Sequence, residues 1–213
     1  MAEVQLTIPS DDISLESSLE EKQGRDICVI LHPHPLYGGN MDNNVVLTVK
    51  KGMNEMGWST LRYNSRGLGK SGGAYDNGEG ESRDLTHVVS YLQGKQPESR
   101  VHVAAYSFGA WVALKAMVEG GWTPESLLLV SPPLNFMSFE GLALPSVRCR
   151  IITGDTDDFC SLATLKAWAG PALEKGEKVQ VNVISRCDHF FWGRESELTS
   201  LVRRFVEEGS PHE

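Results

Sequence analysis

The chain has 213 residues, 40% of them hydrophobic, and is therefore long enough to bury one large core in a single domain over residues 1–213. Its formal net charge of −8 disfavours nucleic acid and anionic membrane surfaces as partners, because both attract basic proteins. The sequence has no apolar run near the roughly 20 residues of a membrane helix and no basic-then-apolar leader, and its four scattered cysteines favour reduced thiols in a cytoplasmic protein.

The predicted elements begin with two half-exposed strands and then alternate between strand and helix. Alternating or continuous apolar residues predict about eight strands, near residues 4–8, 13–19, 26–32, 58–64, 101–106, 126–130, 147–153 and 179–184. Apolar residues at helical spacing predict helices near residues 45–56, 85–92, 110–117, 161–170 and 198–205. This alternation predicts an α/β fold whose mostly parallel central sheet carries helices on both faces. Right-handed crossovers then bring the segments that follow the strands together at one rim of the sheet.

The strand that ends at Tyr106 passes into the next helix through a single serine, Ser107. Ala105 and Gly109 stand two positions to either side, so the pattern is A-x-S-x-G, one methyl group away from the G-x-S-x-G nucleophile elbow. Small residues at these positions permit a tight turn that lifts the serine hydroxyl out of the sheet. We therefore predict that Ser107 is a nucleophile and that the N–H of Phe108 is an oxyanion donor. The alternative is that Ser107 only caps the helix.

A serine nucleophile needs a base within hydrogen-bond reach, and the base needs an orienting acid. His189 follows the last predicted strand and so lies on the required rim, which predicts that it is the base. The loop after the strand at 147–153 contains three carboxylates, of which Asp157 is the preferred acid and Asp155 the main alternative. The unused carboxylates are expected to cap the helix that begins near Ser161.

Five segments together resemble the α/β-hydrolase superfamily, and within it the small bacterial serine hydrolases that lack a lid and their dienelactone hydrolase-like relatives. The segments read HPHPLYGGNMDNNVV, NSRGLGKSGG, AYSFGA, GDTDD and DHFFWG, and the resemblance extends from about Cys28 to Phe205. It implies an α/β-hydrolase fold without a lid domain, with Asp157 as the acid of a G-x-x-D step and His189 as the base.

The resemblance also implies that the second oxyanion donor comes from the HPHPLYGG loop. Pro33 and Pro35 have no N–H, so the donor must be His34, Leu36 or Tyr37. We prefer Leu36 or Tyr37 for this role.

Taken together, these residues predict a carboxylesterase that hydrolyses small short-chain acyl esters through a Ser-His-Asp triad. Its partner would be a small acyl substrate, and the chemistry requires no cofactor and no metal. The link at 131–146 is too short for a lid, and Leu134, Phe136 and Met137 are expected to wall the acyl pocket. A thioesterase or peptidase of the same fold, or a binding protein without catalysis, is the alternative. The sequence also leaves the oligomeric state open, and Trp192 and the first strands are candidates for an interface in a homo-oligomer.

Two other patterns, one typical of a phosphate loop and one of a metal site, indicate function less strongly. The G-K-S sequence at residues 69–71 is typical of a phosphate loop, but Asn64 stands where that loop needs a glycine. His32 and His34 have a spacing that can hold a metal, but no further cluster of His or Cys lies near them in the sequence.

Overall fold

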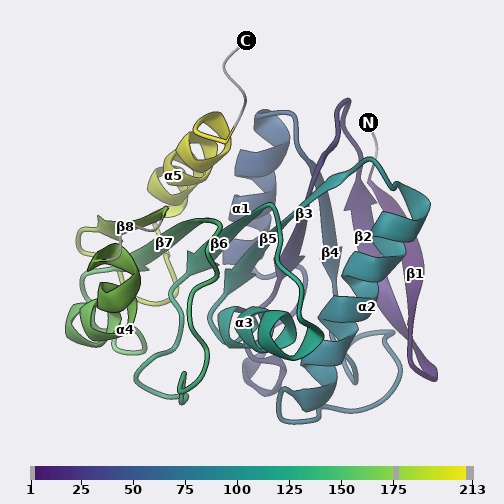
Figure 1. Cartoon of the computed structure of the whole chain (residues 1–213), viewed down its shortest axis with the longest axis horizontal. Coiled ribbons are helices and arrows are strands. Elements are labelled where there is room, and N and C mark those ends of the chain that lie inside the picture. The colour runs from purple at the N-terminus through teal and green to yellow at the C-terminus, as the bar shows by residue number, and fades with distance from the viewer. Residues whose placement is uncertain (1–2, 175–177, 210–213) are drawn as a thin grey trace.

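A computed structural model describes residues 3–174 and 178–209, and one eight-stranded sheet runs through them (Figure 1). The strands are β1 (Val4–Ser10), β2 (Ile13–Glu20), β3 (Asp26–Leu31), β4 (Ser59–Tyr63), β5 (Arg100–Tyr106), β6 (Ser126–Val130), β7 (Arg148–Gly154) and β8 (Val179–Ile184). Their order across the sheet is β1-β2-β4-β3-β5-β6-β7-β8. The β1–β2 and β2–β4 pairs are antiparallel, whereas the pairs from β4 across to β8 are parallel. The predicted α/β fold with a mostly parallel sheet is confirmed.

Helices cover both faces of this sheet. They are α1 (Asn44–Glu55), α2 (Glu79–Lys95), α3 (Phe108–Gly120), α4 (Leu162–Glu174) and α5 (Glu195–Glu207), with a short 3-10 helix, η1 (Pro35–Tyr37). The α1 and α5 helices lie side by side on one face, while α2 and α3 cover the other, as Figure 1 shows. The α4 helix packs its buried residues into the same core as α2 and α3.

Each face of the sheet has its own apolar core, and the central strands supply both. In β3, Val29 and Leu31 face the core under α2 and α3, while Cys28 and Ile30 face the core under α1 and α5. A strand buried on both faces must be apolar at successive positions, which explains its continuous apolar run. Each fully buried aliphatic side chain of this kind contributes about 1.5–3 kcal/mol to folding.

The parallel strands end at a single edge of the sheet, as right-handed crossovers require. That edge collects η1 after β3, the start of α3 after β5, and the loops after β7 and β8. The link between β6 and β7, residues 131–147, is described throughout and contains no helix or strand, in agreement with the predicted lack of a lid domain.

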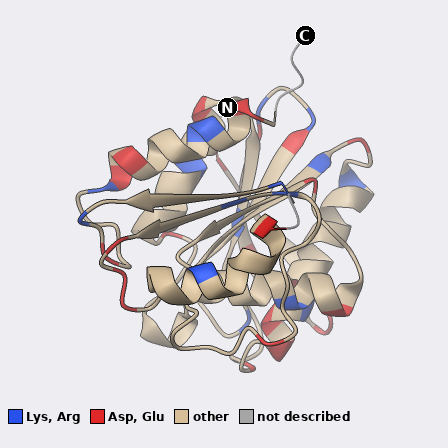
Figure 2. Ribbon diagram, turned by 60° about the vertical axis from the view of Figure 1, so that its left-hand side comes forward, with Lys and Arg blue, Asp and Glu red and all other residues tan. Residues whose placement is uncertain are grey.

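Charged residues of both signs are interspersed on the face that Figure 2 shows, along the helices and in the loops between elements. Among the described residues, no helix is both long and apolar enough to pass through a membrane.

Candidate active site

Ser107 joins β5 directly to α3 through a backbone conformation that residues with a side chain rarely adopt. Its φ is 53° and its ψ is −122°, and its N–H donates to Val130 O at 2.9 Å. Strand and helix approach so closely that a side chain at Gly109 would lie 2.8 Å from both His32 O and Leu31 Cβ. Within the described chain the Ser107 side chain makes no capping bond to α3, so the alternative role of helix cap does not apply.

Three side chains that are far apart in the sequence form one hydrogen-bonded chain. Ser107 Oγ is 2.8 Å from His189 Nε2, and His189 Nδ1 is 3.0 Å and 3.1 Å from the two carboxylate oxygens of Asp157. All three side chains are buried. Both contacts are satisfied when Nδ1–H donates to the carboxylate and Nε2 accepts from the serine hydroxyl. The structure therefore brings together the three residues to which the sequence assigned nucleophile, base and acid.

Close approach of the loops after β7 and β8 makes this chain possible. A side chain at Gly154 would overlap the carbonyl oxygen of Cys187, so only glycine permits the contact. The N–H of Thr156 also donates to Cys187 O, at 3.1 Å. At the end of β5, Tyr106 OH donates to His189 O at 2.8 Å and fixes the backbone of the histidine.

Asp157 is held in its ionised form. Its Oδ1 accepts hydrogen bonds from the N–H groups of Phe159 and Cys160, at 2.9 Å and 3.0 Å. Burial raises the pKa of Asp157, but the hydrogen bond and charge of His189, together with hydrogen bonds from Ser131 and Phe159, outweigh burial, so the pKa lies below its ordinary value. An ionised carboxylate in this position orients the imidazole and stabilises its protonated form.

Asp155, the alternative acid, contacts other residues of the loop that carries His189. Its carboxylate accepts from Ser185 Oγ–H at 3.2 Å and from Cys187 N–H at 3.3 Å, which ties the loop after β7 to the loop after β8. At the start of α4 the N–H of Thr164 donates to Ser161 Oγ at 3.2 Å. The expectation that a spare aspartate caps this helix was therefore wrong, since a serine does so.

The loop after β3 uses most of its own N–H groups internally. Leu36 N–H donates to His34 Nδ1 at 3.3 Å, and Tyr37 N–H donates to His34 O at 3.1 Å. This geometry argues against the sequence preference for Leu36 or Tyr37 as the oxyanion donor. Within the described chain no hydrogen bond uses the N–H of His34 or the N–H of Phe108, which begins α3. These two groups remain available to a ligand.

The imidazole of His34 holds this loop in place. Because Nδ1 accepts from Leu36, the proton of the neutral ring lies on Nε2, which is 3.1 Å from Tyr75 OH. The ring also packs against Phe108, with centroids 4.6 Å apart. Burial lowers the pKa of His34, which favours this neutral form.

A cleft of about 460 Å³ opens over Ser107 and His189. Aromatic side chains form much of its wall, namely Tyr37, Phe136, Phe159 and Phe190. Of the three residues expected to wall an acyl pocket, Phe136 lines the cleft, whereas Leu134 and Met137 pack against the core under α2 and α3.

Comparison with known proteins accords with this geometry. The family model described as serine aminopeptidase, S33, matches residues 23–185. The chain belongs to this family of α/β-hydrolases. As a hydrolase of this family it is 32% identical over 188 residues to a Rickettsia prowazekii protein described as uncharacterised, across 84% of this chain and 78% of the relative.

Two solved structures show the same fold as this α/β-hydrolase. An α/β serine hydrolase homologue from Coxiella burnetii is 33% identical, with a TM-score of 0.86 over 96% of this chain and 97% of the other. An α/β serine hydrolase without a lid from Xanthomonas campestris is 24% identical, with a TM-score of 0.90 over 100% of this chain and 97% of the other.

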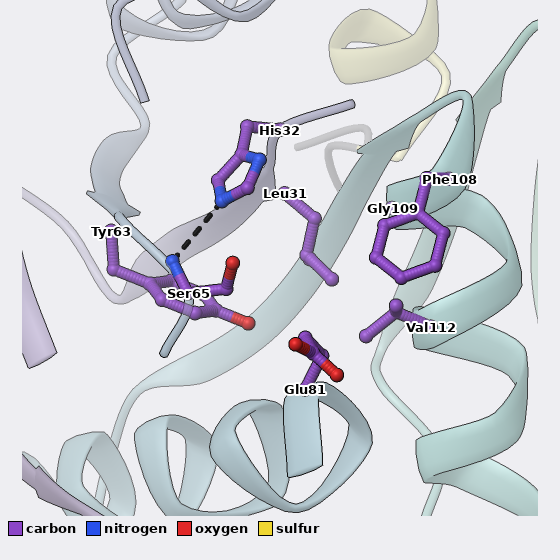
Figure 3. A pocket seen from close by; sticks show the side chains of 8 residues that line it. All are labelled: Leu31, His32, Tyr63, Ser65, Glu81, Phe108, Gly109 and Val112. Carbon is purple, nitrogen blue, oxygen red and sulfur yellow. Dashed lines mark hydrogen bonds between the residues drawn. The ribbon is translucent and has the colours of Figure 1, made fainter. Parts of the chain in front are cut away.

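Behind the serine turn of the hydrolase lies a small cavity of about 10 Å³, enough for one water molecule (Figure 3). His32 is at its edge, where Nε2 accepts from Ser65 N–H at 3.1 Å and Nδ1 lies 2.6 Å from Pro33 O. Both ring nitrogens are thus occupied, and burial lowers the pKa of His32 to about 4. His32 links β3 to the loop after β4, and it is a structural residue of the hydrolase.

The G-K-S segment at residues 69–71 folds against an acidic side chain. The N–H of Lys70 and Nδ2 of Asn64 both donate to Glu16 Oε2, at 2.9 Å and 2.8 Å. A carboxylate already occupies the donors that a phosphate would need, so the geometry argues against a nucleotide site here.

Sequence reasoning missed three residues of this site. Tyr75 contacts His34, while Phe159 and Phe190 pack around His189. Phe159 and Phe190 follow Asp157 and His189 within two positions, so proximity to the predicted acid and base could have indicated them. Tyr75 lies in an irregular segment, and nothing in its spacing points to the loop that it contacts.

Proposed function

We propose that this hydrolase is a carboxylesterase that acts on small, uncharged esters with short acyl groups, with Ser107 as nucleophile, His189 as base and Asp157 as orienting acid. The observation that carries the proposal is the unbroken hydrogen-bonded chain from Ser107 Oγ through His189 to Asp157 beside an open cleft.

In the proposed reaction, Ser107 Oγ attacks the ester carbonyl carbon while His189 Nε2 takes the hydroxyl proton. The N–H groups of Phe108 and His34 donate to the oxyanion, and each such donor typically stabilises the transition state by about 3–4 kcal/mol. The bond to the alcohol oxygen breaks as His189 returns its proton to that oxygen. Water, deprotonated by His189, then cleaves the acyl-enzyme, releases the acid and regenerates Ser107.

The chemistry of the cleft favours an ester over the other acyl compounds. Among the described residues that line it there is no Asp or Glu to bind the ammonium group of an amino-terminal peptide. The same lining has no Lys or Arg to bind the phosphates of a nucleotide-linked thioester. A neutral, largely apolar cleft fits a neutral ester. Since the family description names an aminopeptidase, a peptidase is the second candidate.

Short acyl groups suit a site that no helix covers. The link between β6 and β7 adds no helix that could cover a long chain, and Phe136, which projects from this link, is 68% exposed. The four buried cysteine thiols suit a reducing compartment, so we also propose a cytoplasmic location and a small-molecule partner.

The test is labelling with a fluorophosphonate probe followed by a substrate panel. The probe should label the folded protein at Ser107 and leave Ser107→Ala unlabelled. Hydrolysis should fall from p-nitrophenyl acetate and butyrate to palmitate, and should exceed hydrolysis of amino-acid p-nitroanilides. Absence of labelling, with a control esterase labelled in parallel, would end the nucleophile assignment. A preference for the anilides would favour the peptidase.

A further inference from the structure

One wall of the cleft is a stack of aromatic rings that begins at the imidazole of His189. Phe159 stacks on that imidazole with centroids 4.4 Å apart, and Phe136 stacks on Phe159, also at 4.4 Å. Phe190 meets Phe159 and His189 edge-on, at 6.3 Å and 5.7 Å. Only the imidazole takes part in the proposed chemistry, so the three phenyl rings have no role in it.

The protein holds this wall in place without a ligand. The N–H of Asn135 donates to Phe159 O at 3.0 Å, and its side-chain Nδ2 donates to Asp158 O at 2.9 Å. These bonds tie the loop that carries Phe136 to the loop that carries Phe159. Although these bonds hold the wall, Phe136 is 68% exposed and Phe190 is 49% exposed. Two neighbouring phenyl rings with this much surface in contact with water form an exposed apolar patch, which is a typical feature of a binding site.

The direction of the chemistry shows which part of an ester meets this wall. His189 Nε2 must return its proton to the departing alcohol oxygen, so that oxygen has to lie within hydrogen-bond reach of the imidazole. The group attached to the oxygen then extends over whatever packs on the imidazole, which is Phe159 and beyond it Phe136. Tyr37, which is 87% exposed, also lines the cleft and comes from the loop after β3. The alcohol part of the substrate therefore meets the aromatic rings that continue from the imidazole.

We propose that the site made by Phe136, Phe159 and Phe190 binds a flat, uncharged aromatic group on the alcohol side of the ester, so that arylalkyl and aryl esters are preferred. This inference rests on the proposed esterase function. Aromatic rings gain more from contact with other rings than their buried area alone provides, whereas saturated rings of the same size gain only from the area.

Benzyl acetate and cyclohexylmethyl acetate separate these two contributions, because they share the acyl group and are close in size. For the wild-type enzyme, kcat/KM should be about 2- to 10-fold higher for the benzyl ester after division by the rates of alkaline hydrolysis, as one aromatic contact predicts. Phe136→Leu keeps an apolar side chain and should bring this ratio close to one. Trp192→Leu is the matched control, because Trp192 is 69% exposed in the loop after β8, at the same edge of the sheet, but does not line the cleft. That variant should keep the ratio.

Two results would overturn the inference: equal normalised rates with the two acetates in the wild type, or an unchanged ratio in Phe136→Leu. If that variant does not fold, competitive inhibition of the wild type decides, and benzyl alcohol must then inhibit more strongly than cyclohexylmethanol. Hydrolysis of both acetates without preference leaves the esterase proposal standing. A protein that hydrolyses neither ester and resists the fluorophosphonate probe contradicts the esterase proposal itself.

Discussion

Serine, histidine and aspartate side chains are hydrogen-bonded to one another at both ends of the sheet. At the carboxyl end they are Ser107, His189 and Asp157. At the amino end, His102 Nδ1 is 2.7 Å from Ser126 Oγ, and His102 Nε2 is 2.8 Å from Asp26 Oδ1. The distances are as short as those at the candidate active site, so residue types and hydrogen-bond lengths alone do not separate the two groups.

The two groups differ in where their serines lie on the backbone. Ser126 is the first residue of a regular strand and is 1% exposed, and its Oγ also accepts from Arg148 Nη2 at 3.2 Å. A surface hollow reaches His102, but Ser126 does not line it. The imidazole of His102 stacks on Trp58 with centroids 3.9 Å apart, which fixes the ring inside the core. The amino-end group thus resembles a triad in its bonds but has no nucleophile that a substrate could reach.

The comparison teaches that three hydrogen-bonded side chains of these types are not sufficient, and that the turn and its free N–H groups distinguish the candidate active site. Ser107 stands where a strand passes into a helix, beside two N–H groups that the described chain leaves unused. We therefore expect changes at the carboxyl end to affect rate and matched changes at the amino end to affect stability.

The largest difference is expected for the two serines. Ser107→Ala should lower kcat by up to about 10⁶-fold, as loss of a triad nucleophile does in other serine hydrolases. Ser126→Ala should keep kcat but lower the free energy of unfolding by about 1–3 kcal/mol, because His102 and Arg148 lose a buried partner. Ester hydrolysis and urea denaturation of both variants measure this. Equal loss of activity in the two would contradict the comparison.

The second-largest difference is expected between variants of the two aspartates, Asp157 and Asp26. Asp157→Asn should lower kcat by about 10⁴-fold, because an amide no longer holds the required tautomer of His189. Asp26→Asn, an equally conservative change, should leave kcat within about twofold, since His102 is not involved in the proposed chemistry. Steady-state kinetics at neutral pH gives both values. A rate for Asp157→Asn near that of the wild type would show that Asp157 is not the acid.

A third pair of variants tests the oxyanion donor. The φ of His34 is −58°, which proline adopts without strain, so His34→Pro removes the N–H while keeping the backbone path. His34→Ala removes the imidazole but keeps the N–H. Beyond the loss seen in His34→Ala, the proline variant should lose a further 10²- to 10³-fold in kcat, the usual effect of one oxyanion donor. Equal rates in the two variants would exclude this N–H.

The smallest effect is expected in the pH dependence of stability. Burial lowers the pKa of His102 despite the hydrogen bond to Asp26, so the unfolded chain takes up a proton at a higher pH than the folded protein. Stability is therefore complete above the ordinary histidine pKa of about 6.5 and falls as the pH decreases below it. His32, with a pKa of about 4, adds a loss of the same sign. His102→Gln should flatten the decrease in melting temperature between pH 7 and 5 without removing it. An unchanged slope would show that His102 does not contribute.

Much of this site could be predicted because each triad residue follows a strand end in a chain of alternating elements. The sequence does not show which N–H groups of the loop after β3 are unused, because whether Leu36 N–H is free depends on the ring of His34 turning back on its own loop. The prediction that Leu134 and Met137 line the pocket was wrong for a similar reason. Leu134, Phe136 and Met137 lie in an irregular link with no periodicity, so the sequence does not say which of them faces the core. The order of the sheet, with β4 between β2 and β3, also has no local sequence signal.

The backbone conformation of Ser107 lowers the stability of the folded protein, while it places the hydroxyl proposed for catalysis. A residue with a side chain held at a φ of 53° and a ψ of −122° costs the folded protein about 1–3 kcal/mol. Glycine adopts that conformation without the penalty, so the inactive Ser107→Gly protein should melt at a higher temperature than the working enzyme. Selection for heat resistance alone would thus favour loss of the proposed nucleophile, and only selection for hydrolysis would retain it.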